Sequence, residues 1–145
     1  ITGCTVMINR KLAELVLPIP DESIMHDWWL GLVASNFGRI GFIKDSTIQY
    51  RQHSQNSIGA KGFSYLDIIK KGLDSSYRVS IDGNIEQGKA FLNCYRDKLD
   101  KKTIEMLVDF IHIENKSFWQ KRKILLKHKL LKQGFIRNIG LLAKI

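Results

Sequence analysis

The stretch that decides the fold begins at Asp21, ends at Gly38 and reads DESIMHDWWLGLVASNFG. It opens with Asp, Glu and Ser, which cap and stabilise the N-terminus of a helix, and it closes on a glycine, the residue that most easily adopts a left-handed cap. Large apolar residues recur between these ends at helical spacing: Met25, Trp28 or Trp29, Leu32, Val33 and Phe37. The pattern predicts an amphipathic helix that ends at Phe37 and turns its apolar stripe toward a core.

The residues before this helix predict a connector, a short helix and a strand. Both prolines of the chain fall in the string Leu17-Pro18-Ile19-Pro20. Because a residue that precedes proline is disfavoured in the α region, this string is predicted to be extended. Upstream of it we expect a short helix over residues 10–16 and a buried strand over residues 5–8.

The residues after Gly38 change from a helical period to an alternating one. Apolar residues alternate with polar or small ones on both sides of Asp45-Ser46, which predicts a small β-hairpin over residues 39–52. Residues 53–62 are rich in Ser, Asn and Gly and predict a loop. The pattern is then helical to the end, with helices expected near 64–80, 83–98, 101–116, 118–133 and 136–144.

These elements predict an α+β, mostly helical fold. A partial α/β element with a small β-hairpin is followed by a C-terminal helical bundle, and we divide the chain into residues 1–62, a helical region 63–117 and a basic amphipathic end 118–145. The α/β element has too few strands for a sheet with two covered faces. We therefore expect it to be the end of a larger sheet domain, and the chain to be a piece of a longer protein.

The composition is that of a globular protein. In 145 residues, 44% are hydrophobic and 26% are charged, which excludes a disordered or collagen-like chain. The longest stretch without Asp, Glu, Lys or Arg spans residues 28–38, too short to cross a bilayer as a helix. Cys4 and Cys94 fit no metal or redox spacing, so we expect reduced cysteines in a cytosolic protein.

The excess positive charge lies entirely at the C-terminal end. Residues 1–114 hold all 14 Asp and Glu together with 14 of the 23 Lys and Arg, so they are neutral overall, and residues 115–145 hold the other nine cations without one acid. A basic end on a neutral body favours a docking element over a nucleic-acid-binding surface.

Asp27 is the first candidate for chemistry. It lies one turn into a strongly apolar helix, and Gly31, Ala34 and Ser35 leave space beneath it for another group to approach. The helix N-terminus favours a negative charge, as a general base requires. The simpler alternative, favoured by composition alone, is an ordinary acidic residue in a first helical turn.

A second candidate string is Tyr50-Arg51-Gln52-His53-Ser54-Gln55-Asn56. It leaves a predicted strand for a polar loop, which is where ligands are usually contacted. Arg51 and His53 are suited to a pyrophosphate, and a neutral imidazole also binds metals. The alternative is a surface Arg and His on an exposed hairpin edge.

Taken together, these strings resemble a known family. Gly3-Cys4-Thr5, the proline connector, His26-Asp27-Trp28-Trp29 and the string from Tyr50 to Asn56 have the order and spacing of the second half of a bacterial family 2 glycosyltransferase, similar to the rhamnosyltransferase-like enzymes of cell-surface polysaccharide synthesis. The resemblance covers residues 1–62 and continues more loosely beyond. It implies the GT-A fold, with the nucleotide-binding half and its Asp-x-Asp motif upstream of this chain.

The resemblance also implies roles for individual residues. Asp27 matches the catalytic base that deprotonates the acceptor hydroxyl, with inversion at the anomeric carbon, and His53 matches a histidine that helps to hold the metal or the diphosphate. A divalent metal, Mg or Mn, is implied for the longer parent enzyme, and none is expected to bind tightly to this fragment, which we expect to be inactive alone. The substrate-binding positions implied are Gly3, Cys4, His26, Trp28 and Arg51.

The basic end is predicted to dock on an anionic membrane surface. From Phe118 onward an apolar stripe keeps helical period while lysines fill the rest of the circumference, as in helices that lie at a bilayer surface. The predicted docking residues are Trp119, Lys121, Arg122, Lys123, Lys127 and Lys129.

Several partners follow from these interpretations. We expect a nucleotide-sugar donor and a lipid-linked glycan acceptor for the parent, peripheral attachment at the inner face of the cell membrane, and no nucleic acid; a homo-oligomer is left open. The alternative is a non-enzymatic helical module, either a scaffold or one whose basic tail binds nucleic acid or a partner protein.

Overall fold

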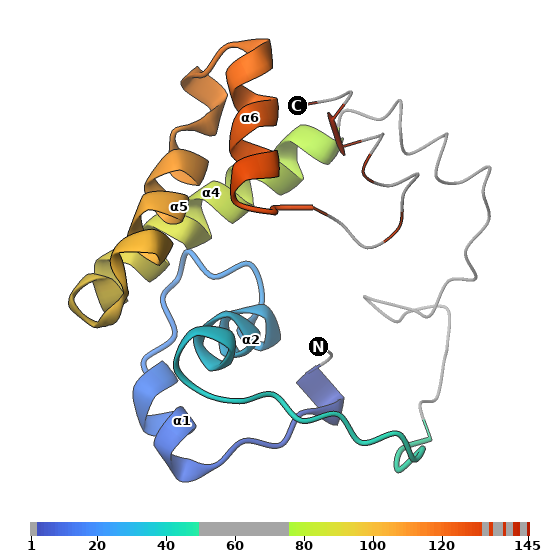
Figure 1. Cartoon of the computed structure of the whole chain (residues 1–145). Helices are drawn as coiled ribbons and strands as arrows, with labels where there is room; N and C mark the ends of the chain where they lie inside the picture. Colours follow the sequence, from blue (N-terminus) through green and yellow to red (C-terminus); the bar gives the residue numbers. More distant parts are fainter. Residues whose placement is uncertain (1–2, 50–75, 132–133, 135–137, 139–140, 143–144) are drawn as a thin grey trace. The chain divides into compact units, whose positions relative to one another are not determined.

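The computed structural model describes residues 3–49, 76–131, 134, 138, 141–142 and 145. The chain divides into two compact units, Ile1–Tyr77 and Arg78–Ile145, and each is described by itself. All regular secondary structure in the described residues is helical, which confirms the mostly helical class (Figure 1). The predicted division between residues 62 and 63 lies outside the described residues.

The first unit is built around two α-helices that contact one another, α1 (Arg10–Val16) and α2 (His26–Phe37). A single 3-10 turn, η1 (Gly3–Thr5), precedes them. The Asn9 side chain caps α1 by accepting from the Leu12 amide at 2.9 Å. The helix ends at Val16, and the next residue, Leu17, is extended because a proline follows it. The predicted short helix over residues 10–16 is therefore confirmed.

Helix α2 begins later than the sequence pattern predicts. The Ser23 amide donates to the Pro20 carbonyl at 3.0 Å, so the acidic residues Asp21 and Glu22 form a separate turn instead of the first helical turn. The helix starts at His26 after Met25, and Gly38 follows its end as predicted. The expected left-handed cap is wrong, because Gly38 is extended and its amide donates to the Ala34 carbonyl at 3.0 Å.

The predicted strands are not found in the described residues. The strand predicted over residues 5–8 is wrong, since η1 ends at Thr5 and residues 6–8 have no regular structure. Residues 39–49 form no hairpin strand, and residues 50–52 lie outside the described part of the chain. A strand needs a neighbouring backbone to bond with, and no described segment pairs with either stretch. Several apolar side chains of these two stretches are accordingly exposed to solvent, Phe42 by 88%.

Within the described residues of the second unit, three α-helices are linked by two 3-10 turns (Figure 1). Their order is α4 (Ser76–Tyr95), η2 (Arg96–Lys98), α5 (Lys101–Ile111), η3 (Ile113–Asn115) and α6 (Phe118–Lys127). Helix α4 runs straight through residues 81–82, where a break was predicted, and α6 ends six residues earlier than the predicted 118–133. The predicted helix over 101–116 is confirmed as α5 with η3, while residues 64–75 lie outside the described residues.

The core of this unit joins α4, α5, η3 and α6 through apolar side chains. Phe91 is fully buried, and its ring lies 5.0 Å from that of Tyr95. Helix α4 approaches α5 closely at Gly88, where an added Cβ would lie 3.7 Å from Phe110 and from Ile111. Other buried apolar residues of the unit are Ile85, Leu107, Ile113, Ile124 and Leu125.

Polar groups fix where α5 and α6 begin. The Asp100 carboxylate accepts from the Thr103 amide at 2.7 Å, and this hydrogen bond holds the pKa of Asp100 below its ordinary value. Ser117 and Gln120 form a capping box at the start of α6, in which the Ser117 amide donates to Gln120 Oε1 at 3.0 Å.

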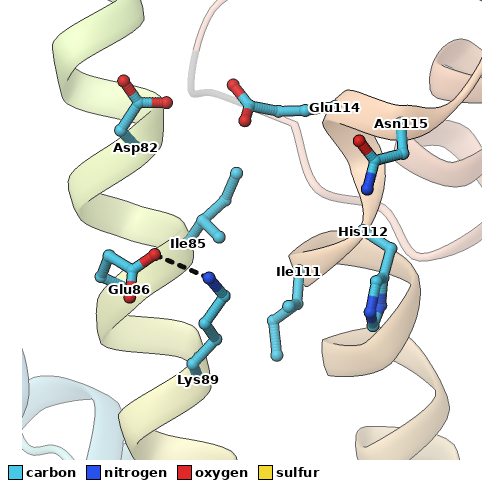
Figure 2. Close-up of a pocket in the computed structure, with 8 residues that line it drawn as sticks. All are labelled: Asp82, Ile85, Glu86, Lys89, Ile111, His112, Glu114 and Asn115. Atoms are coloured by element: carbon cyan, nitrogen blue, oxygen red, sulfur yellow. Dashed lines mark hydrogen bonds and ion pairs between the residues drawn. The ribbon is translucent and has the colours of Figure 1, made fainter.

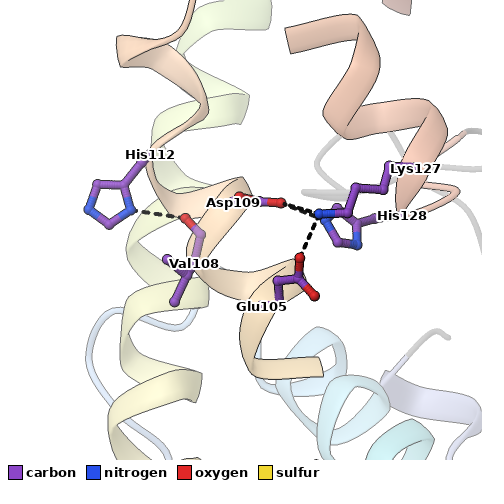
Figure 3. Close-up of polar contacts among 6 residues, drawn as sticks. All are labelled: Glu105, Val108, Asp109, His112, Lys127 and His128. Carbon is purple, nitrogen blue, oxygen red and sulfur yellow. Dashed lines mark hydrogen bonds and ion pairs between the residues drawn. The ribbon is translucent and has the colours of Figure 1, made fainter. Parts of the chain in front are cut away.

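Ion pairs join the end of α6 to the middle of α5 (Figure 3). Lys127 Nζ lies 2.6 Å from Glu105 Oε1 and 3.2 Å from Asp109 Oδ2, and His128 Nε2 lies 2.7 Å from Asp109 Oδ2. The contact with His128 is the main cause that lowers the pKa of Asp109, and Lys127 lowers it further. The same carboxylates raise the pKa of Lys127.

The Asp109 contacts predict how stability depends on pH. Because its pKa is lower in the folded chain than the ordinary value of 3.8, the carboxylate adds stability above pH 3.8 and loses it as the pH falls through the folded-state pKa. We expect Asp109→Asn to lower the free energy of unfolding at neutral pH by about 1 kcal/mol. The difference from the parent chain should vanish in stronger acid, as measured by denaturation followed by circular dichroism. Exposed Asp97→Asn is the matched control, and parallel pH curves for Asp109→Asn and the parent chain would contradict the prediction.

Candidate functional site

Asp27 lies in the first turn of α2 and is almost completely buried, with 3% of its surface exposed. Both carboxylate oxygens accept backbone hydrogen bonds. Oδ2 accepts from the Gly3 amide at 2.9 Å, and Oδ1 accepts from the Trp28 amide at 3.0 Å. A carboxylate has about four lone-pair sites, so these two bonds fix its orientation and leave it further capacity to accept.

The contact with Gly3 joins two segments that are 24 residues apart in the sequence. Gly3 also lies against His26, and a Cβ added at Gly3 would lie only 2.5 Å from His26 Nε2. A larger side chain at position 3 would therefore require the His26 ring to move. The structure therefore brings Gly3, His26 and Asp27 together, three of the residues singled out from the sequence.

The other sequence-predicted residues of this region are distributed differently. Cys4 is exposed and follows Gly3 in η1, and Trp28 is 45% exposed beside Asp27. Both cysteines are free, as predicted. Arg51 and His53 lie outside the described residues.

The described residues supply a fixed carboxylate and an exposed imidazole next to it, since His26 is exposed. A carboxylate of this kind is suited to accepting a proton, and Gly3 contacts both Asp27 and His26. Within residues 3–49 and the described part of the second unit, no group of three or more His, Cys, Asp or Glu could hold a metal ion.

The close approach of Gly3 and His26 gives a prediction for Gly3→Ala. Because the clashing atom is the far end of an exposed side chain, we expect the imidazole ring to move and the chain to remain folded, with a loss of less than about 1 kcal/mol in the free energy of unfolding. The measurement is the NMR spectrum of the His26 ring, which should shift in Gly3→Ala, while the rings of His112 and His128 serve as internal controls. An unshifted His26 ring would show that the two residues are not in contact.

The predicted docking residues of α6 do not share one environment. Trp119 and Lys123 are exposed, whereas Lys121 is half-buried. Arg122 donates to the carbonyls of Phe118 and Leu142, and Lys127 is paired with acids of α5. Lys129 is exposed just after the helix. None of the helices in the described residues is long and apolar enough to cross a bilayer.

A groove of about 320 Å³ in the second unit was not anticipated from the sequence (Figure 2). Side chains of α4 line one side of the groove, and residues from the C-terminal end of α5 through η3 line the other. Its rim carries the Glu86–Lys89 ion pair at 2.7 Å. In the sequence, the groove is signalled by two acidic residues that lie one helical turn apart, Asp82 and Glu86. The lining residues are Asp82, Ile85, Glu86, Lys89, Ile111, His112, Glu114 and Asn115.

Comparisons with known proteins identify no family for this chain. No family model matches the chain, no curated protein matches it, and no solved structure matches it.

Proposed function

We propose that this chain is the acceptor-side part of an inverting, rhamnosyltransferase-like glycosyltransferase. The parent enzyme would move a sugar from a nucleotide-sugar donor to a lipid-linked glycan acceptor in bacterial cell-surface polysaccharide synthesis. The observation that supports the proposal is the hydrogen bond from the Gly3 amide to Asp27, with His26 packed against Gly3. It unites two of the four sequence strings on which the resemblance depends.

In this proposal Asp27 is the general base. Its carboxylate would take the proton from the acceptor hydroxyl while that oxygen attacks the anomeric carbon and the nucleoside diphosphate departs, which inverts the configuration. The amides of Gly3 and Trp28 support this role because they hold both oxygens in one orientation. A base that is already oriented loses no freedom at the transition state.

The roles of the remaining residues in the proposal are supporting. His26 and Trp28 flank Asp27 in the sequence, and Cys4 follows Gly3; these residues would bind substrate together with Arg51. A divalent metal would belong to the parent enzyme, with His53 as a contact. The described residues contain no set of metal ligands, so no step is assigned to a metal from them.

We further propose that the parent enzyme works as a peripheral protein at the cytoplasmic face of the membrane. A lipid-linked acceptor presents its reactive sugar at the bilayer surface. An enzyme held there meets the acceptor at a higher local concentration, which raises the rate of encounter. The exposed Trp119 and Lys123 on α6 support this location.

The proposal is tested on the reading frame and on the protein that contains this chain. The frame upstream of Ile1 should encode a strand followed by Asp-x-Asp, and the whole protein should transfer labelled sugar from a nucleoside-diphosphate donor to a lipid extract with inverted configuration. A continuous upstream frame without such a motif, combined with no transfer from any nucleotide sugar offered, would overturn the proposal.

A further inference from the structure

The surface of α6 that faces away from the core is apolar and basic. Ile124 and Leu125 are buried and define the inner side of this helix. Trp119, Lys123 and Leu126 follow one another at spacings of four and three residues, so they share one side of the helix. All three are exposed, Trp119 by 77% and Leu126 by 57%.

An aromatic pair extends this side at the start of the helix. Phe118 is 55% exposed, and its ring meets that of Trp119 edge to face at a centroid distance of 5.3 Å. Arg122 covers one face of the Phe118 ring at 3.1 Å and also donates to the Phe118 carbonyl at 2.6 Å. The pair is therefore held in place by contacts within the chain, and Arg122 is occupied by them.

The charges that remain available are fewer than the sequence suggests. Lys127 is neutralised by Glu105 and Asp109. Arg122 keeps its charge, because a carbonyl is neutral, but its guanidinium is held by the Leu142 carbonyl and the Phe118 ring. Lys123 lies between Trp119 and Leu126, and exposed lysines flank the helix at positions 116 and 129. Residues 115–145 contain no acid to offset them.

We propose that Phe118, Trp119, Lys123 and Leu126 form a docking face that inserts into the headgroup region of an anionic bilayer. Aromatic and leucine side chains gain by leaving water at the acyl boundary, while lysine is attracted to anionic lipids. A second copy of the chain would bring like charges together, and nucleic acid offers no apolar region for Leu126. This inference deepens the proposed peripheral location and rests on it, but it depends on α6 and stands apart from the role of Asp27.

The docking face is tested by sedimentation of the whole chain with two kinds of vesicle. One is phosphatidylcholine mixed with phosphatidylglycerol, and the other is phosphatidylcholine alone. We expect binding to the anionic vesicles that weakens as salt is added, and far weaker binding to the neutral ones. Equal binding to both, or binding to neither at low salt, would overturn the proposal.

Variants separate the apolar and the electrostatic contributions. Trp119→Gln and Leu126→Gln should each weaken binding to anionic vesicles about tenfold, through lost apolar insertion. Lys123→Gln should weaken it about fivefold. Two controls match these changes elsewhere in the chain: Phe42→Gln removes an equally exposed aromatic ring, and Lys101→Gln removes an exposed charge. Losses in the controls as large as those in α6 would show that no specific face exists.

Insertion is measured directly from tryptophan fluorescence. Brominated lipids should quench Trp119 in anionic vesicles, and the quenching should largely disappear in Trp119→Phe, which keeps an aromatic ring at the same place. Circular dichroism confirms that each variant remains helical. A salt-sensitive shift with RNA and none with vesicles would assign the basic end to nucleic acid instead. Sugar transfer that depends on Asp27 would survive any of these outcomes, so the two proposals fail separately.

Discussion

Asp27→Asn should lower kcat for sugar transfer by roughly 10²–10⁴-fold in the protein that contains this chain, while KM for the donor changes little. The asparagine side chain has nearly the same size and occupies the same buried position in the first turn of α2. It cannot accept a proton at neutral pH, so the step that needs a base is lost in the molecules that remain folded. The measurement is steady-state transfer with the nucleotide sugar varied at saturating acceptor.

A purely structural role for Asp27 makes a different prediction. In Asp27→Asn the side-chain carbonyl could still accept from the Gly3 amide, but the new side-chain amide group would then face the Trp28 amide, which also donates. One unsatisfied donor costs about 1–3 kcal/mol. If Asp27 only clamps the N-terminal segment to α2, the variant should lose stability and yet turn over normally per folded molecule. Exposed Asp21→Asn, in the turn before α2, is the matched control and should change neither quantity.

The helical elements were the part of the fold that local sequence could predict. The Asn9 and Asp100 caps and the proline after Leu17 act within a few residues, so the limits of α1 and the start of α5 follow from them. The strands could not be settled in this way. A strand depends on hydrogen bonds to another segment, and an alternating pattern such as that of residues 39–52 does not tell whether that segment is present.

Helix α4 shows a second limit of local reasoning. A glycine inside a helix costs about 1 kcal/mol relative to alanine, and α4 contains Gly83 next to the break predicted at residues 81–82. The helix nevertheless continues from Ser76 to Tyr95, and buried side chains such as Ile85 and Phe91 supply tertiary packing along it. Propensity along the chain does not include this gain.

The candidate sites show the same limit for charge. Residues 115–145 contain no acid, so the sequence presents nine free cations, but Lys127 meets Glu105 and Asp109 across the helix pair. The position of Asp27 in a first turn could be predicted from its own neighbours. Its contact with Gly3, 24 residues away, follows only from the folded chain.

The largest stability effect is expected at Trp29, the fully buried tryptophan of α2. Trp29 has no exposed surface, and Trp28 beside it is 45% exposed, so the same substitution at neighbouring positions separates burial from chemistry. Trp29→Ala should cost about 3–5 kcal/mol of unfolding free energy, whereas Trp28→Ala should cost roughly 1 kcal/mol.

Amide hydrogen exchange compares the stability of Trp28→Ala and Trp29→Ala, and it does not depend on tryptophan fluorescence. In Trp29→Ala we expect the amides of α1 and α2 to lose protection, because the two helices contact one another around this core, and protection in α5 reports whether the second unit remains folded. The Gly3 contact with Asp27 should be lost with α2, since Asp27 belongs to the first turn of that helix. Equal exchange in Trp28→Ala and Trp29→Ala would show that the buried indole does not stabilise α2. The orientation of the Asp27 carboxylate would then depend on its two hydrogen bonds with the Gly3 and Trp28 amides.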